Sequence, residues 1–260
     1  MNVYLLTDLE GLWGVTDIDF MDRDSDKYLI ARERLTESIN IATRACVEAG
    51  ADNIYYLDGH GGGGNVYEDK VDPRAVKTDV PTWEKLMCEG KIDCLIEIGA
   101  HARAGTIGGF LDHTISSKEW FCHRINGVEM SELTLHALLC GTYGVPIVAC
   151  IGDEVACTQA KEYIPEIYVG AVKVATTRNL AKDYENGDEI LANTVKTALK
   201  NYKNVPIYKV DMPATVEITY YRTDMCEAAL EKCKYNAERV DARTLRKCVE
   251  SFATFGDLKF

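Results

Sequence analysis

Near its start the chain runs Val3-Tyr4-Leu5-Leu6-Thr7-Asp8-Leu9-Glu10-Gly11. Residues 3–7 are apolar without polar alternation, a pattern typical of a strand buried in a parallel sheet. A long amphipathic helix is predicted over residues 29–49, because Gly50 follows its last apolar position. Residues 53–57 predict the next strand. The chain therefore begins with a strand, a helix and a second strand.

The same alternation continues through most of the chain. Residues 92–98 and 146–151 predict buried strands, and residues 130–140 and 154–163 predict helices. We expect an α/β fold with a mainly parallel sheet covered by helices on both faces. Beyond residue 201 the pattern predicts a strand at 214–221, a helix at 225–233, an extended piece near Val240 and a helix at 244–252. We therefore predict an α/β domain over residues 1–205 and a small C-terminal α+β lobe over residues 206–260.

The amino-acid composition and net charge exclude several classes of protein. Of the 260 residues, 47% are hydrophobic and 27% charged, which is a globular balance and not that of a disordered chain. The net charge is −12, so nucleic acid and anionic membranes are poor partners. No segment is apolar enough to span a membrane, and the first apolar run stops at Asp8, so no signal peptide is expected. Ten cysteines without a Cys-x-x-Cys pattern indicate reduced thiols, and we expect a cytoplasmic protein.

Metal-type ligands follow three of the predicted strands. In open parallel sheets, ligands bind where strands end and loops begin at the carboxyl edge. The first strand leads to Asp8 and Glu10, the second to His60, and the third to His101. We expect these side chains to meet at one edge of the sheet.

Each of these residues also has a simpler interpretation. Asp8 and Glu10 lie two apart and point the same way in an extended chain, but they can also be solvated loop acids or a helix cap. A single histidine is more often a hydrogen-bonded structural residue than a ligand. Together, however, carboxylates and neutral imidazoles are the ligand set of Zn²⁺ and its first-row neighbours. The combination favours a metal site.

A further carboxylate is expected from Glu129 or Glu132, although Glu132 can instead pair with His136 four residues later. Three carboxylates around two divalent cations leave one positive charge, which a bridging hydroxide would neutralise. This charge count suits a dinuclear hydrolase. His113 is either a proton donor or electrophile for the reaction, or a surface loop imidazole.

Two other residues near these motifs are assigned more simply. His123 lies in a predicted strand over residues 119–124 and is assigned a structural role. Asp58 either orients a metal ligand or ends a strand as a turn residue.

Five motifs in order resemble the signatures of the DppA-type D-aminopeptidase family of dinuclear zinc peptidases. They are Thr7-Asp8-Leu9-Glu10-Gly11, Asp58-Gly59-His60-Gly61, Gly99-Ala100-His101-Ala102-Arg103-Ala104, Asp112-His113, and Asn126-Gly127 through Ser131-Glu132-Leu133. The similarity runs from residue 1 to about residue 165, and residues 239–244 also resemble the family's C-terminal lobe. Thr7, Gly59 and Ser131 depart from the family pattern without altering a proposed ligand.

The resemblance implies a specific site and activity. Residues 1–205 would be the metallohydrolase domain and would hold two Zn²⁺ or other first-row divalent ions. Asp8 would bridge the metals, with Glu10 and His60 on one and His101 and Glu132 on the other. His113 would be the catalytic imidazole. The resemblance further implies release of N-terminal, often D-, amino acids from short peptides by a metal-bridging hydroxide, in a homo-oligomer that is a decamer.

Three other functions compete with this one. Gly59, Gly61 and Gly64 satisfy G-x-G-x-x-G with Asp79 twenty residues past Gly59, as in an NAD-binding Rossmann oxidoreductase. A dinuclear metallophosphoesterase would use the same metals, although Arg103 is the main cation available for phosphate. A metal-stabilised binding module would need no unligated imidazole such as His113. No G-x-S-x-G occurs to support a serine hydrolase.

Overall fold

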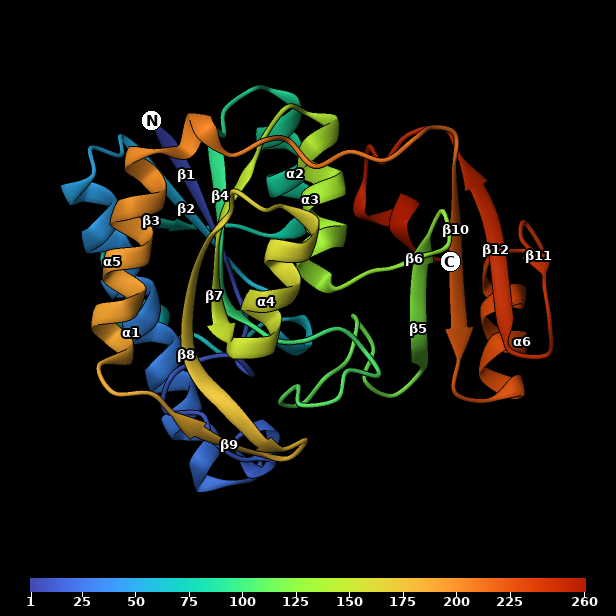
Figure 1. Cartoon of the computed structure of the whole chain (residues 1–260), viewed down its shortest axis with the longest axis horizontal. Coiled ribbons are helices and arrows are strands. Elements are labelled where there is room, and N and C mark those ends of the chain that lie inside the picture. Colours follow the sequence, from blue (N-terminus) through green and yellow to red (C-terminus); the bar gives the residue numbers. More distant parts are fainter.

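The computed structural model describes all 260 residues and contains two β-sheets (Figure 1). The larger sheet has seven strands in the order β3-β2-β1-β4-β7-β8-β9. Their bounds are β1 Asn2–Thr7, β2 Asn53–Asp58, β3 Ala75–Lys77, β4 Cys94–Ala100, β7 Ile147–Asp153, β8 Tyr168–Thr177 and β9 Leu180–Asp183. All neighbouring strands pair in parallel except β8 and β9. The predicted mainly parallel sheet is confirmed.

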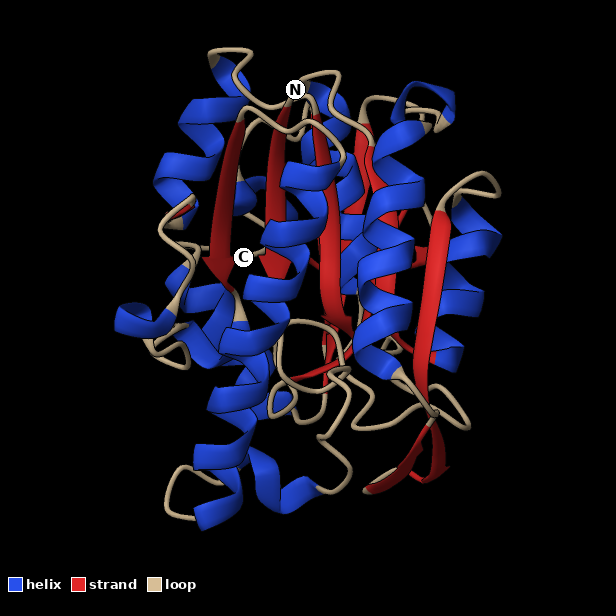
Figure 2. Ribbon diagram, turned by 90° about the vertical axis from the view of Figure 1, so that its left-hand side faces the viewer, coloured by secondary structure: helices blue, strands red, loops and turns tan.

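Helices cover both faces of this sheet, as predicted. Figure 1 shows α1 and α5 on one face and α2, α3 and α4 on the other, and Figure 2 shows the strands between them. The helices are α1 Asp26–Glu48, α2 Val80–Cys88, α3 Glu132–Thr142, α4 Glu154–Tyr163, α5 Gly187–Lys200 and α6 Thr223–Lys232. Short 3-10 helices are η1 Ile18–Met21, η2 His60–Gly62, η3 Glu68–Lys70, η4 Tyr202–Asn204 and η5 Phe255–Leu258. None of the helices has the length and apolar character that a bilayer crossing requires.

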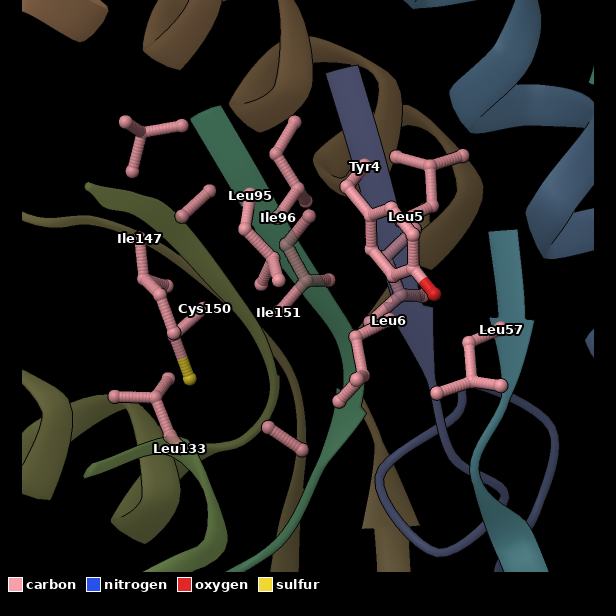
Figure 3. Packing of buried hydrophobic residues seen from close by; sticks show 14 of the residues in the cluster. Tyr4, Leu5, Leu6, Leu57, Leu95, Ile96, Leu133, Ile147, Cys150 and Ile151 are labelled. Carbon is pink, nitrogen blue, oxygen red and sulfur yellow. The ribbon is translucent and has the colours of Figure 1, made fainter. Parts of the chain in front are cut away.

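The central strands form the main hydrophobic core. Every residue of β4 and β7 is buried, and in β1 only Asn2 is not. Figure 3 shows Leu5, Leu95 and Ile151 among the packed side chains of these strands. Because both faces of the sheet are covered, the uninterrupted apolar runs that predicted buried strands have the expected physical cause.

A second, five-stranded antiparallel sheet has the order β11-β12-β10-β5-β6. Its strands are β5 Trp120–Ile125, β6 Val128–Glu129, β10 Ala214–Tyr220, β11 Glu238–Arg239 and β12 Thr244–Val249. The sheet therefore combines chain from both sides of residue 205. The division of the chain at that residue stays a prediction.

The helix predicted over residues 244–252 is wrong, because Thr244–Val249 form β12. This strand pairs with β10 in antiparallel register, from Ala214 opposite Val249 to Thr219 opposite Thr244. Pairing satisfies the backbone groups of β10 and buries Leu245 completely in a small cluster with Ile218. Tertiary pairing therefore outweighs the local helical pattern.

Candidate metal centre

The carboxyl ends of β1, β2 and β4 lie side by side, which brings their exit loops together. Thr7 is in register with Asp58 on one side and with Ile98 on the other. Beyond the strands, the Asp8 amide donates to the Ile98 carbonyl and the Gly59 amide donates to the Thr7 carbonyl, both at 2.8 Å. These bonds continue the pairing past the strand ends and fix where the ligand-bearing loops begin.

Asp8, Glu10 and His60 form the first of two groups that can hold a metal ion. The Nδ1 atom of His60 lies 3.0 Å from Asp8 Oδ1 and 3.0 Å from Glu10 Oε2. Glu10 is buried, whereas the other two side chains are partly exposed. Two carboxylates therefore face one imidazole, as expected from their positions at two strand exits.

His101, His113 and Glu132 form the second group. Glu132 Oε1 lies 3.3 Å from His101 Nε2 and 3.6 Å from His113 Nε2. Asp8 joins the two groups, because its other oxygen, Oδ2, lies 3.4 Å from His101 Nε2. The six residues singled out in the sequence thus meet at one site, and His113 lies within the second group.

The structure shows where the residues lie for which the sequence left alternatives open. Glu132 is at the site, whereas Glu129 Oε1 pairs with Arg124 at 2.8 Å. His136 does not pair with Glu132, since its Nδ1 lies 3.1 Å from Glu97 Oε2 in the core. His123 is on β5 and bonds the Leu258 carbonyl, which agrees with a structural role.

Backbone carbonyls set the tautomers of the second group. Nδ1 of His101 lies 3.0 Å from the Ala102 carbonyl, and Nδ1 of His113 lies 2.8 Å from the Leu111 carbonyl. Since a carbonyl only accepts, each Nδ1 carries a proton and donates it, which leaves Nε2 free to bind a cation. His101 Nε2 is buried and has no hydrogen-bond partner. This unpartnered atom and the imidazole–carboxylate donor set fit a first-row divalent cation.

The electrostatics also fit a cation site. Burial alone would lower the pKa of His60, but the carboxylates of Glu10 and Asp8 outweigh it and raise the pKa to about 11. Burial would raise the pKa of Glu132, but His101 and His113 lower it to about 2. Positive charge beside the clustered carboxylates therefore stabilises their ionised form. Protonated imidazoles can supply this charge, and a bound metal would displace those protons.

Asn65 supports His60 and was missed in the sequence. It is fully buried, and its side-chain amide donates to Asp58 Oδ1 at 2.8 Å and to the His60 carbonyl at 2.7 Å. Tyr28 donates to its oxygen at 2.6 Å. Asp58 is the last residue of β2 and also contacts the His60 loop through Asn65, so its position agrees with both interpretations. An asparagine after glycines resembles any turn residue, so the sequence carried no signal for this role.

The loop that carries His113 is held on both sides of that residue. The Ile115 amide donates to Glu132 Oε1 at 2.7 Å, and Asp112 Oδ2 accepts from the Gly105 amide at 2.7 Å. Leu111 and Ile115 have φ angles of 49° and 60°. Such left-handed conformations are strained for branched side chains and are common at functional sites. The role of Ile115 depends on its backbone, so its residue type could not reveal it.

The first group, together with His113 and Glu132 of the second, lines one cavity of about 490 Å³, a size typical of small-molecule sites. Lys118 and Arg178 also line it, and Arg178 Nε lies 2.9 Å from Asp112 Oδ1. Arg103, the phosphate ligand considered in the sequence, is not among the lining residues. The cavity is therefore acidic around the candidate metal ligands, with few cations to bind a phosphoester.

The glycine run does not form a dinucleotide-binding loop. Residues His60–Gly62 form the short helix η2, the chain continues into η3 and β3, and the next α-helix begins only at Val80. A dinucleotide needs the amino end of a helix directly after its glycines. The Rossmann alternative based on Gly59, Gly61 and Gly64 is therefore wrong.

The parallel strands of this fold deliver imidazoles and carboxylates to one sheet edge, a donor set that suits a first-row divalent cation. A family model described as D-aminopeptidase, of the M55 peptidases, matches residues 1–257, and the chain belongs to that family. It is therefore a hydrolase of the aminopeptidase class, as the motifs predicted.

A known protein and a solved structure, both from Bacillus subtilis, are similar to this chain. A D-aminopeptidase of Bacillus subtilis (strain 168) is 30% identical over 230 residues, which cover 85% of this chain and 82% of that protein. The solved structure of the Zn-dependent D-aminopeptidase DppA from Bacillus subtilis, described as a self-compartmentalizing protease, superposes with a TM-score of 0.89. That match covers 98% of this chain and 93% of the other at 24% identity, and it confirms the fold.

Proposed function

We propose that this chain is a dinuclear zinc aminopeptidase that releases N-terminal D-amino acids from short peptides. The observation that carries the proposal is the placement of Asp8 between two imidazoles. Its Oδ1 lies 3.0 Å from His60 Nδ1 and its Oδ2 lies 3.4 Å from His101 Nε2. A carboxylate that presents one oxygen to each of two ligand groups is suited to bridge two metal ions.

The proposed ligand set follows from this placement. Asp8 is shared, Glu10 and His60 complete one site, and His101 and Glu132 complete the other. When bound, two zinc ions supply a water deprotonated near neutral pH as the nucleophile and polarise the scissile carbonyl. The neighbour described as Zn-dependent supports zinc over other first-row metals.

His113 is proposed to handle protons and developing charge. Its Nδ1 proton is held by the Leu111 carbonyl, so the ring presents Nε2 to the cavity beside Glu132. In its neutral form Nε2 accepts a proton, and in its protonated form it donates one to the leaving amine or stabilises the carbonyl oxygen. The net charge of −12 favours the approach of a substrate with a positively charged α-amine.

The substrate and assembly are part of the same proposal. Preference for D-residues rests on the name of the Bacillus relative. Assembly into a homo-oligomer is supported by the self-compartmentalizing neighbour, and a decamer is the state that the family resemblance implies. A cytoplasmic location stays a prediction from the sequence.

Metal analysis tests the proposal directly. Protein purified without chelator should contain two zinc ions per chain by mass spectrometry, and Asp8→Asn should lose metal from both sites. The wild type should release p-nitroaniline from D-Ala-p-nitroanilide and act poorly on the L-isomer and on p-nitrophenyl phosphate. Faster phosphate release would favour the phosphoesterase, and a protein that binds zinc without hydrolysing either substrate would favour a binding module.

A further inference from the structure

Lys173, near the middle of β8, has an unusual environment for a lysine. Its side chain is fully buried, and its Nζ lies 5.0 Å from the centroid of the Phe110 ring. No carboxylate oxygen lies within ion-pair distance of Nζ. Burial of an amine is unfavourable unless its protons are hydrogen-bonded, so its partners indicate what the residue does.

The hydrogen-bond acceptors of Lys173 are two carbonyls of one loop. Nζ donates to the Glu10 carbonyl at 2.9 Å and to the Val15 carbonyl. Residues 8–17 form the loop between β1 and η1, which carries both carboxylates of the first metal group. Lys173 therefore bonds the main chain of a candidate ligand from the side of the sheet, while the Glu10 side chain faces His60.

Other residues of the β8–β9 ribbon contact the same loop further along. Asp183, opposite Lys173 in the antiparallel pair, accepts from the Gly14 amide at 2.9 Å. The Ala181 amide donates to the Thr16 carbonyl at 2.8 Å. Among these contacts, the bond from Lys173 is the one made to Glu10 itself.

On the opposite side, β4 fixes the loop without contacting the Glu10 carbonyl. The Gly11 amide donates to the Gly99 carbonyl at 2.8 Å, and the Asp8 amide donates to Ile98. These bonds hold the residues before and after Glu10. Because the Glu10 carbonyl and the Gly11 amide belong to one peptide unit, Gly99 holds that unit from one side and Lys173 holds it from the other.

We propose that Lys173 is a positioning residue for the first metal site, in which its hydrogen bond to the Glu10 carbonyl fixes the direction of the Glu10 carboxylate toward the ion shared with His60 and Asp8. The inference rests on the proposed dinuclear centre and adds to it a residue outside the ligand set. Partners that orient metal ligands typically contribute about 10–100-fold to metal affinity.

The test measures zinc binding to the full-length protein by competition with a chelating dye. Lys173→Met keeps the length of the side chain and removes both hydrogen bonds. We expect one of the two zinc-binding steps to weaken roughly 10–100-fold and the other to stay within about threefold. Asp183→Asn, which touches Gly14 and not Glu10, should leave both steps within about threefold of the wild type.

Val172→Ala is the matched control for a weakened strand. Val172 precedes Lys173 in β8, is 2% exposed and packs in the main hydrophobic core. The Val172→Ala variant should have a lower thermal midpoint of unfolding and an unchanged affinity for zinc. If Lys173→Met does not fold, Lys173→Gln, which keeps one donor, should show a smaller weakening of the same single step.

Three outcomes would overturn the assignment. They are unchanged zinc binding in the folded lysine variant, equal weakening of both steps, and a loss in Asp183→Asn or Val172→Ala as large as in the lysine variant. A wild-type protein that binds no zinc would instead refute the dinuclear centre. Failure of the inference and failure of the proposed function are therefore separate results.

Discussion

The imidazole rings of His101 and His113 stack with their centroids 4.1 Å apart and an angle of 11° between their planes. Each ring donates its Nδ1 proton to a backbone carbonyl, and each Nε2 faces Glu132 Oε1. The two rings nevertheless differ in burial, because the His101 side chain is 2% exposed and that of His113 is 12% exposed. The buried ring is better placed to be a permanent ligand, and the more exposed ring to exchange protons with a substrate.

His113→Ala should separate these two roles. We expect the turnover number to fall about 10²–10⁴-fold, the usual contribution of a general acid or base, while two zinc ions per chain remain bound. Turnover of D-Ala-p-nitroanilide and zinc content would be measured on the same sample, with His123→Gln as the control for loss of a distant imidazole. A protein with one zinc ion would show that His113 is a ligand, and full turnover would show that it has no role in the chemistry.

Removal of metal should lower thermal stability. A ligand that binds only the folded state at 100 times its dissociation constant stabilises it by about 2.7 kcal/mol. In a chain of this size that corresponds to a fall of roughly 5–10 °C in the thermal midpoint when zinc is chelated. Calorimetry with and without a chelator measures the shift, and Asp8→Asn should show none. An equal shift in that variant would place the stabilising metal elsewhere.

Gly11→Ala should abolish zinc binding by displacing the loop that follows β1. A Cβ atom on Gly11 would lie 2.1 Å from the Ala100 carbonyl oxygen, which is backbone and cannot move aside. The control is Gly105→Ala, where φ is +79° but no atom lies within 4 Å of the added carbon. The control should lose about 1–2 kcal/mol from backbone strain alone and keep its zinc. Zinc binding that survives in Gly11→Ala would contradict the tight packing of β1 and β4 at this exit.

The sequence predicted where the candidate ligands meet because one geometric rule connects their positions. Parallel strands end at one edge, so apolar runs followed by Asp8, His60 and His101 are sufficient to bring these residues together. The choice between Glu129 and Glu132 needed the structure, because it depends on where α3 begins. Ser131 caps that helix and makes Glu132 its first residue.

Other features depend on contacts that a single sequence does not specify. Asn65 acts through its amide and Ile115 through its backbone, and neither leaves a characteristic pattern. Residues 244–249 have a locally helical pattern, but they form a strand because they pair with the edge of β10 that β5 does not occupy. The sequence was informative about residues whose position follows from the order of the strands. It was not informative about residues whose role depends on individual hydrogen bonds or on the choice of strand partner.

Acid should lower the stability of the folded protein through His123. This imidazole lies on β5, is 1% exposed, and donates from Nε2 to the Leu258 carbonyl at 2.7 Å. Burial lowers its pKa from 6.5 to about 4, and the hydrogen bond to Leu258 offsets only part of this effect. The unfolded chain therefore takes up a proton below about pH 6.5, whereas the folded protein does so only near pH 4.

The sign follows from this order of protonation. Between pH 6.5 and 4 the unfolded state binds the proton more readily, so the free energy of unfolding falls as pH falls, by roughly 3 kcal/mol in total at about 1.4 kcal/mol per pKa unit. His123→Gln keeps a donor for Leu258 and cannot titrate, so urea unfolding should show a shallower decline in this variant over the same range. Carboxylates contribute equally to both proteins and cancel in the difference. Identical pH profiles would mean that the pKa of His123 is the same in the folded and the unfolded protein, which would contradict its lowering by burial.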